Sequence, residues 1–254
     1  ANNTTVTFTP SNMTAGAYTA TISDAVNDLN GNAMVQSYSW SFENLGSWEL
    51  LTSTAPWGNR SEHSVLAYNN KLWLMGGYVD SSTYLNDVWY SSDGSNWTQA
   101  TSGAGWNGRL SHKAVVYNNK MWVMGGGQGC CSNSSGNLPY HNDVWYSSDG
   151  VNWSRATSSF MVSDSVGGRS DFGLTVFNNK MWVIGGWYNI ADTMNNSLKS
   201  DVWYSTDGST WTQSTSNFGS GSYGHSAAST SSMIWVFGGR YGSSNLCWYS
   251  SDGI

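Results

Sequence analysis

Four internal repeats constrain the fold of this 254-residue chain more than any other feature of the sequence. Each repeat contains a short apolar run with a central Trp that ends in a Gly-Gly pair, at Gly77, Gly126, Gly186 and Gly239. A second motif, Trp-Tyr-Ser-Ser/Thr-Asp-Gly, follows every time and ends at Gly94, Gly150, Gly208 and Gly253. The first glycines of the Gly-Gly pairs are 49, 60 and 53 residues apart. A period near 50 residues predicts one supersecondary unit per repeat, stacked on its neighbours.

The pattern within a repeat predicts four short β-strands. Runs of four to seven apolar or β-branched residues are bounded by Asn-Asn or Asp-Gly pairs, which favour tight hairpins. In the first repeat the expected strands cover residues 64–68, 71–75, 88–91 and 97–100. Helical periodicity is absent throughout, so the sequence predicts an all-β chain.

The two linked motifs place the repeats in a known context. A Gly-Gly pair that closes the second strand and a Trp-Tyr pair in the third, at this period, resemble the kelch family of β-propellers over residues 46–254. The resemblance implies four-stranded blades whose sheet faces pack on neighbouring blades. Leu72 and Leu74 are then expected to face one neighbour, and Trp73 and Met75 the other. Four blades are visible.

The two ends of the repeat region raise the question of ring closure. Residues 46–53, around Trp48, match a fourth strand, yet no first three strands precede them. The last repeat, with Trp248, stops just before a fourth strand. Either the outer strand at the start closes a ring of four blades beside Trp248, or the four blades belong to a larger ring. We assign residues 45–254 to the propeller.

Residues 1–44 have a different pattern. Polar and apolar residues alternate at 5–9, 16–22 and 37–42, as in sandwich strands. The segment resembles the second half of a bacterial Ig-like domain of large surface proteins. Because three or four strands do not complete a sandwich core, we expect the chain to begin within that domain. The alternative is that a partner chain donates the missing strands.

Composition excludes several classes of partner and favours one location. Only 10% of residues are charged and the net charge is −6, so a phosphate-neutralising surface and a nucleic-acid partner are not expected. No stretch of 18 apolar residues is present, so we expect no membrane insertion by a helix. Abundant Asn, Ser, Thr and Gly with few Lys and Glu indicates an extracellular protein, and the resemblance implies a bacterial secreted or cell-surface one.

Loop lengths separate a uniform face of the propeller from a variable one. The interval from Arg60, or its equivalent, to the first Gly of the pair is 16 in every repeat. The intervals from that Gly to the Trp of strand three are 13, 20, 18 and 10, and those from the strand-four Trp to the next repeat are 12, 12, 16 and 11. In a propeller these two sets of connections emerge on the same face. We expect the function to lie on this variable-loop face.

Aromatic residues outside the repeat positions are the candidates for ligand binding. Twelve of the 16 Trp residues occupy repeat positions and are expected in the core, whereas Trp57, Trp106 and Trp187 fall in the connections. The alternative is that these rings only pack the long loops on themselves. The candidate ligand-binding set is Trp57, Trp106, Tyr140, His141, Trp187, Tyr188, Arg240 and Tyr241.

Repeated charged residues suggest a second candidate site. Arg60, Arg109 and Arg169 enter the innermost strands of three successive blades and could bind a carboxylate near the axis. The alternative is that they hold blade-to-blade hydrogen bonds. His63, His112 and His225 also recur in register, which favours structural roles, and His141 by itself is too little for a metal site. No metal or cofactor is expected.

The three cysteines divide into an adjacent pair and a single residue. Cys130 and Cys131 lie in the longest loop and are predicted to form a vicinal disulfide; two free thiols are the alternative. Cys247 occupies the position of Val88, Val144 and Val202, so we expect it to be a buried small hydrophobe.

These features favour a non-enzymatic extracellular module for binding, adhesion or surface structure. Its partner is expected to be a glycan or a protein on the variable-loop face, and the same loops are the expected site of self-association. The alternative is a secreted carbohydrate-active enzyme of galactose-oxidase-like or sialidase-like type. Galactose-oxidase-like proteins use copper held by two His and two Tyr, whereas three of the four His here occupy repeat positions. The Asp-Gly turns resemble sialidase Asp boxes, which are turn devices remote from catalysis.

Overall fold

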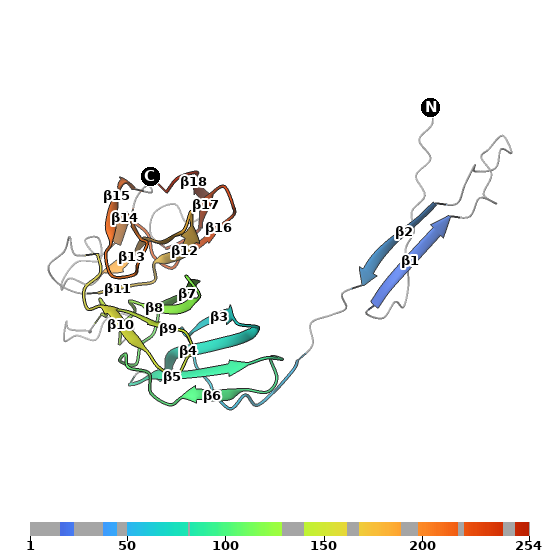
Figure 1. The fold of residues 1–254 in the computed structure, drawn as a ribbon, viewed down its shortest axis with the longest axis horizontal. Helices are drawn as coiled ribbons and strands as arrows, with labels where there is room; N and C mark the ends of the chain where they lie inside the picture. Colours follow the sequence, from blue (N-terminus) through green and yellow to red (C-terminus); the bar gives the residue numbers. More distant parts are fainter. Residues whose placement is uncertain are drawn as a thin grey trace. The chain divides into compact units, whose positions relative to one another are not determined.

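The computed structural model describes residues 16–22, 38–44, 50–80, 82–128, 140–161, 168–188, 198–217, 221–240 and 247–253. Every regular element among these residues is a β-strand, and the strands of the repeats form four blades, so the all-β propeller prediction is confirmed. The chain divides into two compact units, Ala1–Ser53 and Thr54–Ile254. Figure 1 labels their strands.

The first unit contributes one antiparallel pair, β1 (Gly16–Ile22) with β2 (Tyr38–Asn44). Hydroxyl pairs across the two strands support their register: Thr19 Oγ1 lies 3.2 Å from Ser41 Oγ, and Thr21 Oγ1 lies 2.7 Å from Ser39 Oγ. These strands confirm two of the three expected Ig-like strands. The third, residues 5–9, lies outside the described residues.

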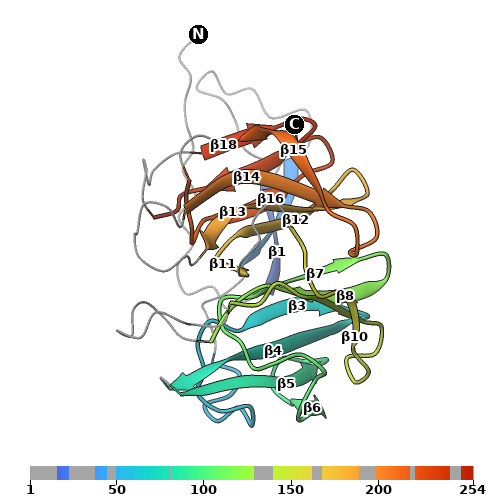
Figure 2. The same ribbon diagram turned by 90° about the vertical axis from the view of Figure 1, so that its left-hand side faces the viewer.

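The second unit contains the blades, which follow one another in chain order from teal to red in Figures 1 and 2. Blade one comprises β3 (Ser64–Tyr68), β4 (Lys71–Asp80), β5 (Thr83–Ser91) and β6 (Thr98–Thr101). Blade two comprises β7 (Lys113–Tyr117), β8 (Lys120–Met124), β9 (Val144–Ser147) and β10 (Ser154–Thr157). In both sheets the strands pair antiparallel in sequence order.

Blade three comprises β12 (Gly173–Phe177), β13 (Lys180–Tyr188), β14 (Leu198–Ser205) and β15 (Thr212–Asn217), and β11 (Arg169–Ser170) pairs with the far end of β13. Blade four comprises β16 (Ser226–Ser229), β17 (Ile234–Phe237) and β18 (Cys247–Ser250). In blades one and three, strand two continues beyond its Gly-Gly pair, and strand three begins earlier to pair with this extension. Both strands are therefore longer than the sequence pattern predicts. Bulges at these glycines allow pairing to continue across the kink.

The hairpins opposite the variable-loop face are uniform because their turn residues impose one geometry. Asn69 and Asn70 both adopt left-handed backbone conformations, with φ of 49° and 55°, and the Asn-Asn pairs of the next two blades do the same. In the Asp-Gly turn of blade one, the carboxylate of Asp93 accepts hydrogen bonds from the backbone N–H groups of Ser95 and Asn96. The same Asx arrangement recurs in blades two and three.

The core lies between the blades. Trp73 and Met75 of β4 pack in one cluster with Met121 and Val123 of β8, which confirms that alternate residues of strand two face opposite neighbours. Tyrosine hydroxyls add polar contacts across the same junctions. Tyr117 Oη donates to the backbone carbonyl of Asn179 in blade three, at 2.7 Å. Tyr68 Oη makes the same contact with Asn119 in blade two.

The end of the propeller unit corrects one prediction. Among the described strands β18 pairs only with β17, so no fourth strand covers its outer edge. Cys247 is free and exposed, so the expectation that it is buried is wrong; its equivalent in blade one, Val88, is buried because it packs against the next blade. Trp48 lies outside the described residues, so closure by its strand remains a prediction.

No helix among the described residues is long and apolar enough to cross a membrane.

Candidate functional site

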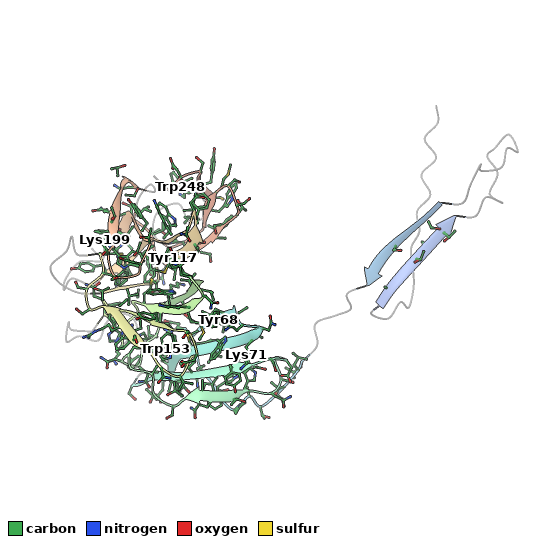
Figure 3. All side chains as sticks on the ribbon, in the orientation of Figure 1. Tyr68, Lys71, Tyr117, Trp153, Lys199 and Trp248 are labelled. Atoms are coloured by element: carbon green, nitrogen blue, oxygen red, sulfur yellow. The ribbon has the colours of Figure 1, made fainter. Side chains whose placement is uncertain are left out.

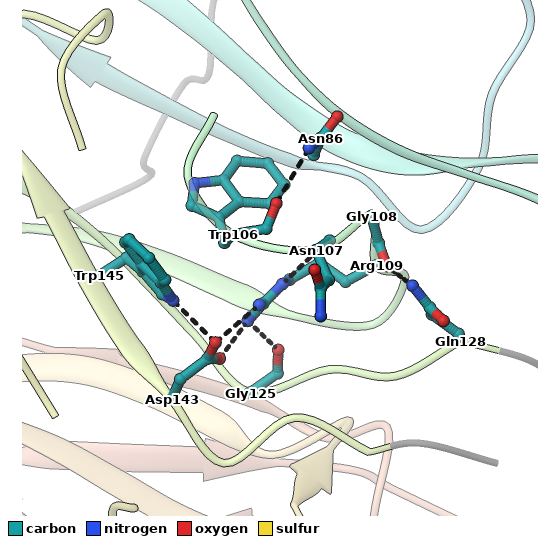
Figure 4. Close-up of polar contacts among 9 residues, drawn as sticks. All are labelled: Asn86, Trp106, Asn107, Gly108, Arg109, Gly125, Gln128, Asp143 and Trp145. Atoms are coloured by element: carbon teal, nitrogen blue, oxygen red, sulfur yellow. Dashed lines mark hydrogen bonds and ion pairs between the residues drawn. The ribbon is translucent and has the colours of Figure 1, made fainter. Parts of the chain in front are cut away.

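A buried arginine fixes the start of each of the first three blades, and Figure 4 shows the arginine of blade two, Arg109. In blade two the Arg109 guanidinium forms two hydrogen bonds with the Asp143 carboxylate, at 2.8 and 3.2 Å. Its Nη1 also donates to the backbone carbonyl of Gly125 at 2.9 Å, and Trp145 Nε1 donates to Asp143 at 2.7 Å. Burial of Asp143 would raise its pKa, but the hydrogen bonds and charge of Arg109 outweigh this and lower the pKa.

The same arrangement corrects the prediction of an axial anion site. Arg60 pairs with Asp87 at 2.7 Å and Arg169 with Asp201 at 2.6 Å, and all three arginine side chains are buried. Because each positive charge is already neutralised inside its own blade, no guanidinium is available for an external carboxylate. The alternative, that these arginines hold hydrogen bonds between blades, is true of their backbone only: the Arg169 carbonyl accepts a hydrogen bond from the Gly126 N–H at 2.8 Å. The overlooked sequence signal was the aspartate two residues before the Trp-Tyr pair in the first three repeats.

Trp57 and Trp106 are structural residues. Trp106 is buried and meets Trp153 edge to face, with ring centroids 6.0 Å apart. Trp57 is half-buried and meets Trp97 in the same way at 5.9 Å. The expectation that Trp106 is exposed in a variable loop is wrong because the ring fills the junction between strand four and the next blade. A constant interval of nine residues after the strand-four Trp, from Trp48 to Trp57 and from Trp97 to Trp106, indicates this role in the sequence.

The histidines are held neutral by burial. Desolvation, reinforced by the charge of Arg109, lowers the pKa of His112 to about 3. The same causes, in the same order, lower the pKa of His141 to about 4. His225 is buried too, and its Nε2 lies 2.9 Å from the carbonyl oxygen of Ile184 and 3.1 Å from the backbone nitrogen of Gly173. His141 was expected in a ligand site, but its side chain lies within the packed junction beside Arg109 and is not displayed to solvent.

One backbone position on the variable-loop face is the same in all blades yet carries a different residue in each. The residue directly after the Gly-Gly pair forms an antiparallel bridge with the residue directly after the Arg position. The bridging pairs are Tyr78 with Ser61, Gly127 with Leu110, Trp187 with Ser170, and Arg240 with Tyr223. A fixed frame therefore presents a tyrosine, a glycine, a tryptophan and an arginine side by side in successive blades.

The next residue inward also recurs in one unusual conformation. Glu62, Ser111, Asp171 and Gly224 all have left-handed backbones, with φ between 52° and 69°. Their backbones form a chain from blade to blade: Ser111 N donates to the Glu62 carbonyl, Asp171 N to Ser111, and Gly224 N to Asp171. The Ser111 hydroxyl also donates to the Glu62 carboxylate. This inner arc adds polar groups to the bridging positions, and the sequence analysis missed it because the residue types differ.

Aromatic rings gather around the bridging positions. Tyr78 stacks on Tyr84 with centroids 6.5 Å apart, and Trp187 meets Tyr223 edge to face at 5.0 Å. Tyr140 is half-buried and bridges Gly127 in blade two. Tyr188 is buried under the ammonium group of Lys199, which lies 4.8 Å from its ring centroid, so its ring is not displayed as expected.

Of the remaining predicted residues, Arg240 is exposed at its bridge, whereas Tyr241, Cys130 and Cys131 lie outside the described residues. The predicted vicinal disulfide is thus untested. Within the described ranges no group of three or more His, Cys, Asp or Glu side chains is placed to hold a metal ion.

Comparison with protein families finds three matches. A family described as the KLHDC2/KLHL20/DRC7 Kelch-repeats domain matches residues 27–186, which is more than half of the chain. The Kelch motif matches residues 168–217, and the Bacterial Ig-like domain matches residues 1–44. Both resemblances noted in the sequence are thereby confirmed.

Comparison with solved structures finds a similar propeller fold. The structure described as "Structure of YjhT" superposes with a TM-score of 0.56 at 17% sequence identity, over 72% of this chain. The matched part spans 60% of the length of that protein. At this identity the likeness shows the fold alone. No curated protein sequence matches the chain.

Proposed function

This chain belongs to the kelch-repeat family, and from that premise we propose that it is an extracellular module of a bacterial secreted or surface protein that binds a partner on its variable-loop face. Kelch propellers act in general as protein-binding or structural modules, and they are mostly non-catalytic. The partner that the site suits best is a protein or a glycan that offers polar, uncharged surface. The carbohydrate-active enzyme considered from the sequence has no observation among the described residues in its favour.

The observation that carries this proposal is the set of bridging positions. The same backbone bridge occurs at equivalent residues of each blade, and it places Tyr78, Trp187 and Arg240 in different blades on the variable-loop face. Tyr, Trp and Arg are the residue types that contribute most of the binding energy at protein interfaces. Because these residues extend from paired strands, their rings lose little conformational entropy when a partner binds.

The electrostatics of the face support an uncharged partner. The three repeat arginines are neutralised internally, and in the inner arc the carboxylates of Glu62 and Asp171 act as hydrogen-bond acceptors, each for a serine hydroxyl. A glycan presents hydroxyl donors and flat apolar ring faces, which match acceptors and aromatic side chains together. The aromatic pairs Tyr78–Tyr84 and Trp187–Tyr223 supply such faces. This specific observation keeps a glycan beside a protein partner as the second candidate.

The extracellular assignment is supported by composition and by the first unit. The chain has a tenth of its residues charged and matches a bacterial Ig-like domain over residues 1–44. An Ig-like unit before the propeller suits a spacer that presents the binding face away from a cell surface.

The test is a paired substitution, Tyr78→Ser with Trp187→Ser, assayed on a glycan array and against a displayed library of secreted bacterial proteins. We expect the paired variant to keep the native near-UV circular dichroism and to lose at least tenfold in affinity for the bound partner. Val151→Ser is the matched control, because Val151 is an exposed apolar residue of an Asp-Gly hairpin on the opposite face. Unchanged binding by the paired variant, with loss in the control, would show that the opposite face binds.

A further inference from the structure

A tryptophan and a histidine with unused hydrogen-bonding groups are buried together between blades one and two. Trp106 is 1% exposed and His112 is 2% exposed, and their ring centroids lie 6.0 Å apart. Among the described residues, the Trp106 Nε1 and both ring nitrogens of His112 have no hydrogen-bond partner in normal geometry. A buried donor or acceptor that stays unpaired lowers stability, so these atoms point to a bound hydrogen-bonding group.

The same pair recurs in blade one and is replaced as a pair in blade three. The rings of Trp57 and His63 lie 6.3 Å apart, and Trp57 Nε1 and His63 Nδ1 also have no hydrogen-bond partner among the described residues. In blade three the equivalent rings are Phe160 and Phe172, again 6.3 Å apart and both fully buried. The indole donor and the imidazole are therefore present together or absent together, which indicates that they act on one common partner.

The chemistry of the two rings defines what that partner is. The Trp106 indole is a donor only, so the partner must accept a hydrogen bond. His112 is neutral, because burial lowers its pKa to about 3, and a neutral imidazole has one N–H and one acceptor nitrogen. The Arg109 carbonyl lies near the ring and suits the N–H, which leaves the acceptor nitrogen. The partner must therefore accept from Trp106 and donate to His112.

We propose that one water molecule is bound in this junction, accepting a hydrogen bond from Trp106 Nε1 and donating one to the unprotonated nitrogen of His112. Water both accepts and donates, whereas a cation could not accept from the indole. One water bridges nitrogen atoms up to about 6 Å apart, and two protein partners are sufficient to hold a buried water. The water joins the connection that carries Trp106 to the start of β7, which follows His112 directly. The Phe160–Phe172 pair needs no such water.

The experiment locates the water in the unmodified full chain at pH 7, by a high-resolution crystal structure and by nuclear Overhauser transfer from water to the indole N–H protons. We expect a water about 3 Å from both Trp106 Nε1 and a His112 ring nitrogen, and none between Phe160 and Phe172. The indole signal that Trp106→Phe removes should show the transfer. A direct hydrogen bond between the two rings, or no water within hydrogen-bonding distance of Trp106 Nε1, would overturn the proposal.

His112→Phe tests the role of the histidine, because it gives blade two the residue that blade three has at this position. The water and its transfer to Trp106 should disappear. His63→Phe is the matched control, the same change at the same repeat position of blade one, and should leave the Trp106 water in place. Thermal unfolding verifies that both variants are folded, and the measurements on the unmodified chain need neither. A water that stays bound to Trp106 in folded His112→Phe would contradict the bridge.

Discussion

Blades three and four share one repeat pattern but differ in how far the pattern is completed. Blade three has the Arg169–Asp201 ion pair, and its Trp203 is 6% exposed. Blade four has Ser222 where the arginine stands, and Leu246 replaces the aspartate in the sequence. Its equivalent tryptophan, Trp248, is 42% exposed and is labelled in Figure 3.

The difference shows which contacts make a blade and which depend on its neighbour. Blade four keeps its strand pairing, its two positive-φ glycines, Gly238 and Gly239, and the serine-capped turn before Gly253. These features are local to the repeat. Burial of Phe237 and Tyr249 needs a following sheet, so these side chains are exposed although blade four has the strand pattern of the other blades. The ion pair is made inside each of the first three blades and has no counterpart in blade four, where Ser222 stands in place of the arginine.

The ion pair gives the largest expected difference between the blades. Arg109→Ala leaves the Asp143 carboxylate in a buried position without its counterion, so we expect the free energy of unfolding to fall by about 3–5 kcal/mol. Ser222→Ala, the equivalent change in blade four, should alter it by less than about 0.5 kcal/mol, because Ser222 bonds the preceding blade through its backbone N–H and carbonyl, which the change keeps. Urea unfolding measures both. Equal losses would mean that the ion pair is not what distinguishes the inner blades.

Glycines with positive φ test the blade junctions more finely. Gly150→Ala and Gly224→Ala both place a methyl group at a positive φ, of 75° and 69°, but the added Cβ lies 2.0 Å from Trp73 at Gly150 and meets no atom within 4 Å at Gly224. Both changes strain the backbone equally, so we expect Gly150→Ala to cost about 1–3 kcal/mol more, the cost of overpacking. The comparison is made by urea unfolding. No difference would show that the junction yields to the added methyl.

The buried side chain of His112 should make the folded chain less stable at acidic pH. The pKa of His112 is about 3 in the folded chain and 6.5 for an unperturbed histidine, so below pH 6.5 the unfolded chain takes up a proton that the folded chain excludes. Stability is therefore fully present above pH 6.5 and falls as the pH decreases toward 3. Between pH 7 and pH 5 this group accounts for a loss of about 2 kcal/mol.

His112→Phe should remove that loss, since blade three carries Phe172 at the same repeat position. Chemical unfolding of both proteins at pH 7 and pH 5 measures the difference. If the variant loses as much stability between pH 7 and pH 5 as the unmodified chain, the loss comes from other groups, such as His141 or the aspartates whose pKa is lowered.

The smallest expected effect is at the tyrosine that crosses the junction from blade two to blade three. Tyr117→Phe removes the hydroxyl that donates to the Asn179 and Thr206 carbonyls, and should cost about 1 kcal/mol. Blade three has Phe177 at this position and blade four has Thr230, so the contact becomes weaker along the chain. Tyr249→Phe in the exposed β18 is the control, and a similar loss there would contradict the explanation.

The sequence alone determined the blades. Strand periodicity, Asn-Asn and Asp-Gly turns and the Gly-Gly kinks act within a few residues of one another, so their consequences could be predicted from one repeat and counted in four. The alternation of Leu72 and Leu74 with Trp73 and Met75 followed from the two-residue period of a strand. The uniform turns and the variable loops followed from the interval lengths.

Only the tertiary structure decided which residues the repeated side chains contact. Arg109 meets an aspartate 34 residues later, and Trp106 meets Trp153 from the far end of the next blade. The bridging positions, with Tyr78, Trp187 and Arg240, share a backbone pairing and have no residue type in common. Cys247 matches buried valines in the repeat but is exposed, because burial depends on whether another sheet lies across the strand. A repeat specifies the contacts that it makes within itself, whereas the contacts of its faces require the neighbouring blade to be in place.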